Sequence, residues 1–136
     1  ALRRLPPPGG AVHAFNGSDV ERDAFLQFGL RLGFGGACTY AGSKRIRRHL
    51  AELPDGAWLL ETDAPDMPGS KRRDAHEREG KSLLTEPADI LEAARAAAEL
   101  RGITVEEAAK VSRDAAIAAF PRLSGLLALP DAFAKR

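Results

Sequence analysis

Three short apolar segments alternate with two amphipathic ones in the first half of the chain, and this alternation most constrains the fold. The apolar segments at 11–15, 30–40 and 57–60 have the composition of buried strands. Between them, 18–28 and 43–53 carry apolar residues at helical spacing. Strands that alternate with helices predict βαβ units, a parallel sheet and right-handed crossovers. The first half of the chain is therefore predicted to be α/β.

The second half has a different pattern. Segment 66–84 carries charges of both signs without sustained periodicity, which predicts a long solvated loop. An alanine-rich helix is predicted over 85–102, and a capping box at 104–107 predicts the start of another. A separate short helix is expected over 112–120. The tail at 121–136 is apolar enough to pack, but its pattern specifies no conformation.

Charge and cysteine usage exclude several classes of function. The 136 residues include 20 Lys and Arg against 19 Asp and Glu, so no global basic field holds DNA or an anionic membrane. A single cysteine, Cys38, cannot form an internal disulfide and is expected to be a small buried residue. No apolar run approaches the roughly 18 residues of a membrane span. With no signal-peptide pattern at the start, a cytoplasmic location is expected.

Two side chains stand where parallel sheets place ligands and catalytic groups, at the C-terminal ends of strands. His13 lies near the end of the first predicted strand, and Asp63 ends the third. Strand alternation places Glu61 on the same face as Asp63, and His13 can point to the same centre. Imidazole and carboxylate groups are ordinary ligands of zinc, manganese and similar divalent cations. The sequence therefore allows a metal site there.

Each of these residues also has a purely structural interpretation. His13 could be a hydrogen-bonded structural histidine, and Asp63 could cap a turn. Glu61 fits a carboxylate behind the ligands or in a buried ion pair better than a direct ligand. Asn16 could help present backbone N–H groups to an anion where the first helix begins, or could be structural only.

The remaining polar candidates are expected to lie at the surface. His49 falls in a basic helix and His76 in the charged loop, and both are predicted to be solvated. The basic residues of the loop are predicted to be solvated, with phosphate contact as the alternative; they are Lys71, Arg72, Arg73, Arg78 and Lys81.

Three motifs together resemble the TatD family of metal-dependent hydrolases: VHAFNGS at 12–18, GFGGACTY at 33–40 and WLLETDAPDMP at 58–68. The ETDAP pentapeptide after an apolar strand is the most specific of them. The C-terminal half resembles the family ending, with Glu86-Pro87 opening the alanine-rich helix. The resemblance implies a (β/α)8 TIM barrel of the amidohydrolase type with a one- or two-metal site, in a family that includes deoxyribonucleases.

The resemblance also implies roles for two residues. His13 is similar to the metal-ligand histidine on strand six of the barrel. Asp63 is similar to the catalytic aspartate after strand eight, which binds metal and takes a proton from the attacking water. A divalent ion (Zn, Mg or Mn) is the implied cofactor, DNA or another phosphodiester the implied substrate, and Glu86 and Asn16 are possible supporting or substrate contacts. Thr85 and Asp114 stand where the family commonly has asparagine, which puts substrate preference and local packing in question.

The family's other metal ligands, including a paired-histidine motif on its first strand, have no counterpart in this sequence. We therefore expect residues 1–136 to be a partial barrel domain, the C-terminal portion with strands six to eight, and expect it to self-associate if it folds alone. Two other functions stay open. The chain could be an inactive fragment or interaction module, or the parent could catalyse another amidohydrolase-type hydrolysis.

Overall fold

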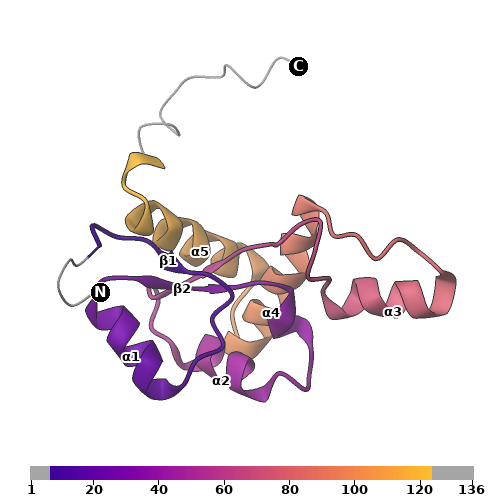
Figure 1. Ribbon diagram of the computed structural model, residues 1–136, viewed down its shortest axis with the longest axis horizontal. Helices are drawn as coiled ribbons and strands as arrows, with labels where there is room; N and C mark the ends of the chain where they lie inside the picture. The colour runs from indigo at the N-terminus through magenta and orange to yellow at the C-terminus, as the bar shows by residue number, and fades with distance from the viewer. Residues whose placement is uncertain (1–6, 124–136) are drawn as a thin grey trace, which may run out of the picture.

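The computed structural model describes residues 7–123, and it contains a three-stranded parallel sheet. The strands pair in chain order, with Leu32 opposite Val12 on one side and Trp58 on the other. A helix lies in each crossover, so the α/β prediction for this half is confirmed (Figure 1). These elements are β1 (Ala11–Val12), α1 (Asp19–Gln27), β2 (Arg31–Phe34), α2 (Lys44–Glu52) and β3 (Trp58–Leu60).

The first two strands are shorter than predicted. The first was expected to reach Phe15, but β1 ends at Val12. The second was expected to continue to Tyr40, but β2 gives way to a short 3-10 helix, η1 (Gly36–Thr39). The early end of β2 goes with a close approach of the Met67 backbone to Gly36, where a Cβ would overlap the Met67 carbonyl oxygen. The chain therefore leaves the sheet early on the side where the candidate site residues lie.

A capping box begins α1. The Ser18 hydroxyl accepts a hydrogen bond from the Glu21 N–H, and the Glu21 carboxylate accepts one from the Ser18 N–H. In α2 the prediction for His49 is wrong, because its side chain is fully buried. It packs on the Phe15 ring with centroids 5.3 Å apart, and its Nε2 lies 3.1 Å from the carbonyl oxygen of Gly17.

The C-terminal half is helical, with two boundaries that differ from the prediction. The alanine-rich helix was predicted to start at residue 85, but α4 starts at Ile90, after a short 3-10 helix at 87–89. Residues 104–107 form the predicted capping box, but α5 then continues without a break through Ser112. The Ser112 hydroxyl accepts a hydrogen bond of 2.8 Å from the Leu60 N–H, so this helix covers the outer edge of β3. The elements are η2 (Pro87–Asp89), α4 (Ile90–Arg101) and α5 (Val105–Ala119).

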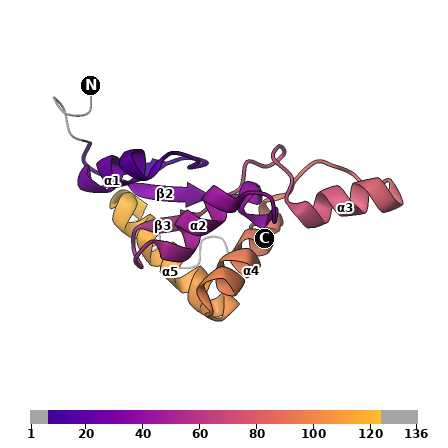
Figure 2. The ribbon, with the colours of Figure 1, turned by 90° about the horizontal axis from the view of Figure 1, so that it is seen from below.

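Segment 66–84 is not the uninterrupted loop that the sequence predicts. It contains α3 (Ser70–Glu79), which projects from the rest of the molecule and buries none of its residues (Figures 1 and 2). Apolar periodicity cannot reveal such a helix, because it has no apolar face. Good helix formers such as Lys, Arg, Ala and Glu fill it, and Gly80 ends it in the left-handed conformation.

The two faces of β3 pack into different clusters, as strand alternation predicts. Trp58 and Leu60 enter the main core with residues of α2 and α4. Leu59 points the other way and packs with Ala115 and Ala119 of α5. Cys38 is buried in the main core, which confirms the expectation for it.

Two further predictions concern the tail and the membrane. Most of the tail at 121–136 lies outside the described residues, which end at Leu123. Within 7–123, no helix combines the length and the apolar character that a membrane crossing requires.

Candidate metal site

His13 directly follows the end of β1, and its imidazole is exposed there. Ala14 has a φ of 45°, which turns the chain, so that Phe15 enters the core while the His13 side chain remains 65% exposed. The longer predicted strand would place His13 and Phe15 on one face, but in the structure the two side chains point in different directions. The turn still directs His13 towards the carboxylates that follow β3.

Both ring nitrogens of His13 lie at hydrogen-bond distance from a carboxylate. Nδ1 is 2.9 Å from Glu61 Oε1, and Nε2 is 2.7 Å from Asp63 Oδ1. The Glu61 oxygen also accepts a hydrogen bond of 2.5 Å from the Ala14 N–H. The structure thus brings together the three side chains that the sequence placed at one end of the sheet.

These carboxylates raise the pKa of His13 above its ordinary value. The hydrogen bond that the ring donates to Glu61 is the main cause, followed by the charge of Glu61, and Asp63 adds to both effects. Desolvation opposes the shift by less than either effect of Glu61 but by more than either effect of Asp63. When the ring is protonated, both nitrogens donate to carboxylates, so the trio is arranged to hold positive charge at this position.

The position of Glu61 depends on glycine in the neighbouring strand. A Cβ built on Gly33 would lie 2.6 Å from the Glu61 carboxyl carbon, and one on Gly35 would lie 3.1 Å from the Glu61 carbonyl oxygen. The sequence signalled this close approach by placing glycine within a strand. The Ala14 N–H, by contrast, was missed, because nothing in the sequence marks an alanine with positive φ.

The donor atoms match a divalent cation in type but not in number. Glu61 fixes Nδ1, which leaves Nε2 to face Asp63 as a carboxylate–histidine–metal arrangement requires. Two ligands of a tetrahedral ion with bonds of about 2.1 Å lie about 3.4 Å apart, so the two side chains would separate slightly on binding. Within residues 7–123 there is no group of three or more His, Cys, Asp or Glu that could hold an ion. His13 and Asp63 therefore fit a metal as part of a larger ligand set.

The two supporting candidates have partners of their own. The Asn16 Oδ1 accepts hydrogen bonds from the Arg45 side chain at 3.0 and 3.2 Å, which ties the loop after β1 to α2. Glu86 is 71% exposed and lies 3.9 Å from Arg72, and its backbone N–H donates to Asp89 at the start of η2. A substrate contact by either residue stays a prediction.

Comparison with known proteins identifies the family. A family model described as "TatD related DNase" matches residues 1–121. The chain is 47% identical over 62 residues to the uncharacterized metal-dependent hydrolase YjjV of Escherichia coli (strain K12), covering 46% of this chain and 24% of that protein. It is 35% identical over 100 residues to the 3'-5' ssDNA/RNA exonuclease TatD of Dickeya dadantii (strain 3937), covering 73% and 36%.

A solved structure agrees with these sequence relationships. The crystal structure of YjjV from Escherichia coli superposes with a TM-score of 0.73 at 32% identity, covering 88% of this chain and 44% of that one. The fold neighbours are TatD-like TIM barrels of the amidohydrolase type, of which this chain shows a partial α/β unit with three parallel strands. The chain spans less than half the length of these relatives. It belongs to the TatD related DNase family.

Proposed function

We propose that this chain supplies His13 and Asp63 as ligands of a divalent metal ion in a hydrolase that cleaves phosphodiester bonds, with DNA as the expected substrate. The observation that carries the proposal is the imidazole held between Glu61 and Asp63 at the C-terminal ends of parallel strands. The names of the relatives, metal-dependent hydrolase and ssDNA/RNA exonuclease, support the same chemistry.

Each residue of the trio has a distinct role in this proposal. Glu61 accepts from Nδ1 and so holds the ring with Nε2 directed at Asp63. Asp63 uses Oδ1 towards His13, while Oδ2 accepts no hydrogen bond from any described residue and can take a proton from an attacking water. A bound divalent cation supplies Lewis acidity and lowers the pKa of water towards neutrality. Asp63 is thus the proposed catalytic residue.

The position of the chain in a barrel is also part of the proposal. We assign its strands to positions six to eight of a (β/α)8 barrel and residues 1–136 to one partial barrel domain, with 121–136 as its tail. The order of the His13 and Asp63 motifs supports this assignment, as does the coverage of 44% of the YjjV structure. In a complete barrel, the remaining metal ligands then come from the other strands. If the chain folds alone, association with a second copy covers the open sheet edge of β1.

The test compares matched carboxylate variants in the full-length protein. Asp63→Asn is expected to abolish Mg²⁺- or Mn²⁺-dependent cleavage of a single-stranded DNA oligonucleotide and to reduce metal content. Asp23→Asn, which changes an exposed carboxylate paired with Arg22, serves as the control and is expected to retain both. Equal activity of the two variants would remove Asp63 from the catalytic role.

Two further measurements address the open alternatives. Calorimetric titration of the 136-residue chain with Zn²⁺ or Mn²⁺ tests whether the chain is an inactive fragment or interaction module, because such a chain is expected to bind no metal tightly. A panel of phosphodiester, lactone and amide substrates tests the reaction class. Metal-dependent turnover of only the lactone or amide substrates would replace the phosphodiesterase assignment with another amidohydrolase-type reaction.

A further inference from the structure

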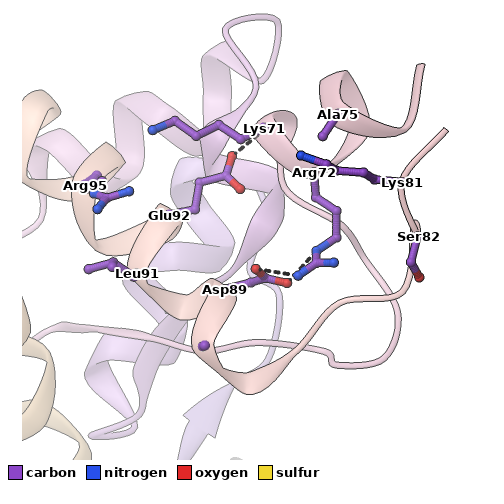
Figure 3. A pocket seen from close by; sticks show the side chains of 10 residues that line it. Lys71, Arg72, Ala75, Lys81, Ser82, Asp89, Leu91, Glu92 and Arg95 are labelled. Carbon is purple, nitrogen blue, oxygen red and sulfur yellow. Dashed lines mark hydrogen bonds and ion pairs between the residues drawn. The ribbon is translucent and has the colours of Figure 1, made fainter. Parts of the chain in front are cut away.

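A groove of about 360 Å³ lies between α3 and α4, and none of its lining residues belongs to the His13 trio. Its size is within the range of ligand sites in proteins. Figure 3 shows Lys71 and Arg95 on the same side of the groove, with Glu92 and the Arg72–Asp89 pair beside them. The charged side chains that line it are Lys71, Arg72, Lys81, Asp89, Glu92 and Arg95.

The two carboxylates of the groove are held in different ways, and only Asp89 is paired with a cation. Asp89 forms a two-pronged ion pair with Arg72, with nitrogen–oxygen distances of 2.7 and 2.9 Å, and this pairing lowers the pKa of Asp89. Glu92 accepts hydrogen bonds from the Ser70 hydroxyl and the Lys71 N–H at the start of α3. The charge of Asp89 is therefore balanced by Arg72, whereas Glu92 is fixed in position but keeps its negative charge.

Two of the basic side chains have no such partner. Lys81 pairs with Glu79 at 2.5 Å, but Lys71 Nζ and the Arg95 guanidinium form no ion pair with any residue of the described part. Both side chains are exposed to solvent at the groove. Lys71 and Arg95 against the single carboxylate of Glu92 leave an excess of one positive charge on this side of the groove, since the other two cations are paired.

The groove has a fixed position relative to the candidate metal site. The short segment 64–69 joins Asp63 to α3, and the Tyr40 hydroxyl donates a hydrogen bond of 2.7 Å to the Pro68 carbonyl oxygen in it. The Ser70 N–H donates to the Thr39 hydroxyl at 2.8 Å, and a Cβ on Gly69 would overlap the Glu92 carboxylate. These contacts hold the start of α3 against η1 and α4, so the two cations are presented on a supported surface.

We propose that this groove binds the phosphodiester backbone of a nucleic-acid strand, with Lys71 and Arg95 contacting phosphate. Arginine matches phosphate geometry with paired donors, and lysine adds a point charge, so the two are the usual backbone contacts. The proposal rests on the proposed function for the class of substrate. It adds a binding surface, outside the metal ligands, that positions the strand and carries no sequence information.

The test measures binding in EDTA, where cleavage cannot interfere. A fluorescein-labelled single-stranded oligodeoxythymidylate is titrated with the chain, and anisotropy is followed at several salt concentrations. Lys71→Gln/Arg95→Gln is compared with Lys110→Gln/Arg113→Gln, which removes the same charge from the exposed face of α5. Circular dichroism and thermal unfolding confirm that both variants are folded.

We expect the groove variant to bind at least tenfold more weakly and the α5 variant to bind within twofold of the parent. The slope of log K against log salt should fall in magnitude by roughly 1.4 for two lost single-strand contacts. Unchanged binding by the groove variant, equal loss in both variants, or no binding by the parent would each overturn the proposal.

The outcome is separable from that of the proposed function. Groove-dependent binding without any metal-dependent phosphodiester cleavage by the full-length protein would overturn the proposed function and leave the groove assignment standing. Asp63-dependent cleavage together with unchanged binding by Lys71→Gln/Arg95→Gln would do the reverse.

Discussion

Gly33 lies directly against the carboxylate of Glu61, so that a methyl group at position 33 would overlap the group that holds the His13 ring. A Cβ built there would lie 2.6 Å from the Glu61 carboxyl carbon and 2.8 Å from Oε1. The backbone of Gly33 has no positive φ, so space is the only obstacle to a side chain. The place of the glutamate on β3 is therefore set by the absence of a side chain on β2.

Gly33→Ala is expected to lower the free energy of unfolding by about 1–3 kcal/mol, because the added methyl group overpacks the site. It should also displace Glu61 from His13. Stability is measured from the midpoint of urea unfolding, with one m-value fitted to the parent and the variants. Gly42→Ala is the control, because nothing lies within 4 Å of a Cβ there. A loss no larger than that of Gly42→Ala would show that Glu61 relaxes freely.

A double variant identifies the colliding partner. If the Glu61 carboxylate causes the loss, then Gly33→Ala should cost less in a Glu61→Ala background than in the parent, because the overlapping atoms are gone. The coupling is measured from four urea curves. Additive losses would contradict a direct collision between the two positions.

The stability contributed by His13 should depend on pH in a defined direction. Its pKa is raised in the folded state, chiefly by the hydrogen bond that the ring donates to Glu61, so folding favours the protonated ring. The contribution is full below about pH 6.5 while the carboxylates stay ionised, and it is lost as pH rises through the raised pKa. In metal-free buffer, His13→Gln should therefore destabilise the protein more at pH 6 than at pH 9.

NMR titration of the His13 ring gives a direct check on the cause. The parent should titrate above the ordinary value of about 6.5, and Glu61→Gln should lower that pKa because it removes the largest cause of the shift. An unchanged pKa in Glu61→Gln would mean that Asp63 or another charge dominates.

We expect Arg101 to stabilise the folded chain more than an exposed surface arginine does. Its Nη1 donates to the carbonyl oxygens of Leu50 at 2.7 Å and Leu53 at 2.8 Å at the end of α2, and its guanidinium lies 5.0 Å from the Trp58 ring centroid. Arg101→Lys cannot reproduce this fork and should cost about 2 kcal/mol. Arg113→Lys, on the exposed face of α5, should change stability by less than about 0.5 kcal/mol.

The fluorescence of Trp58, the only tryptophan in the chain, reports the same change locally. Loss of the stacked guanidinium should alter the emission of Arg101→Lys while Arg113→Lys keeps the parent spectrum. Similar unfolding midpoints for the two variants would contradict the capping role of Arg101.

Cys38 should be inert in the folded protein. Its side chain is fully buried, and burial raises the pKa of the thiol to about 12, so almost no thiolate is present at pH 8. Ellman's reagent should react slowly in buffer and stoichiometrically in guanidinium chloride. Rapid labelling of the folded chain would mean that the core around η1 opens on the timescale of the reaction.

Local patterns predicted the elements that bury an apolar face or carry a cap. The parallel α/β order and the Ser18 and Thr104 capping boxes follow from such patterns, and so does the end of α4 at Gly102, which adopts the left-handed conformation. Helix α3 lacks an apolar face, and its partner Glu92 is distant in sequence, so apolar periodicity could not predict it. His49 was misplaced because its flanking arginines suggested a solvated face, whereas contact with Phe15 buries it.

The sequence by itself determined the alternation of strands and helices in the first half of the chain, the family, and the fact that His13, Glu61 and Asp63 stand at one end of a parallel sheet. These properties depend on residue order and on periods of two and 3.6 residues, which are local. Only the tertiary structure decided that the His13 ring bridges the two carboxylates, that Gly33 makes room for Glu61, and that α3 and α4 form a basic groove. Those relationships join residues far apart in the chain, and packing of the folded backbone sets the distances between them.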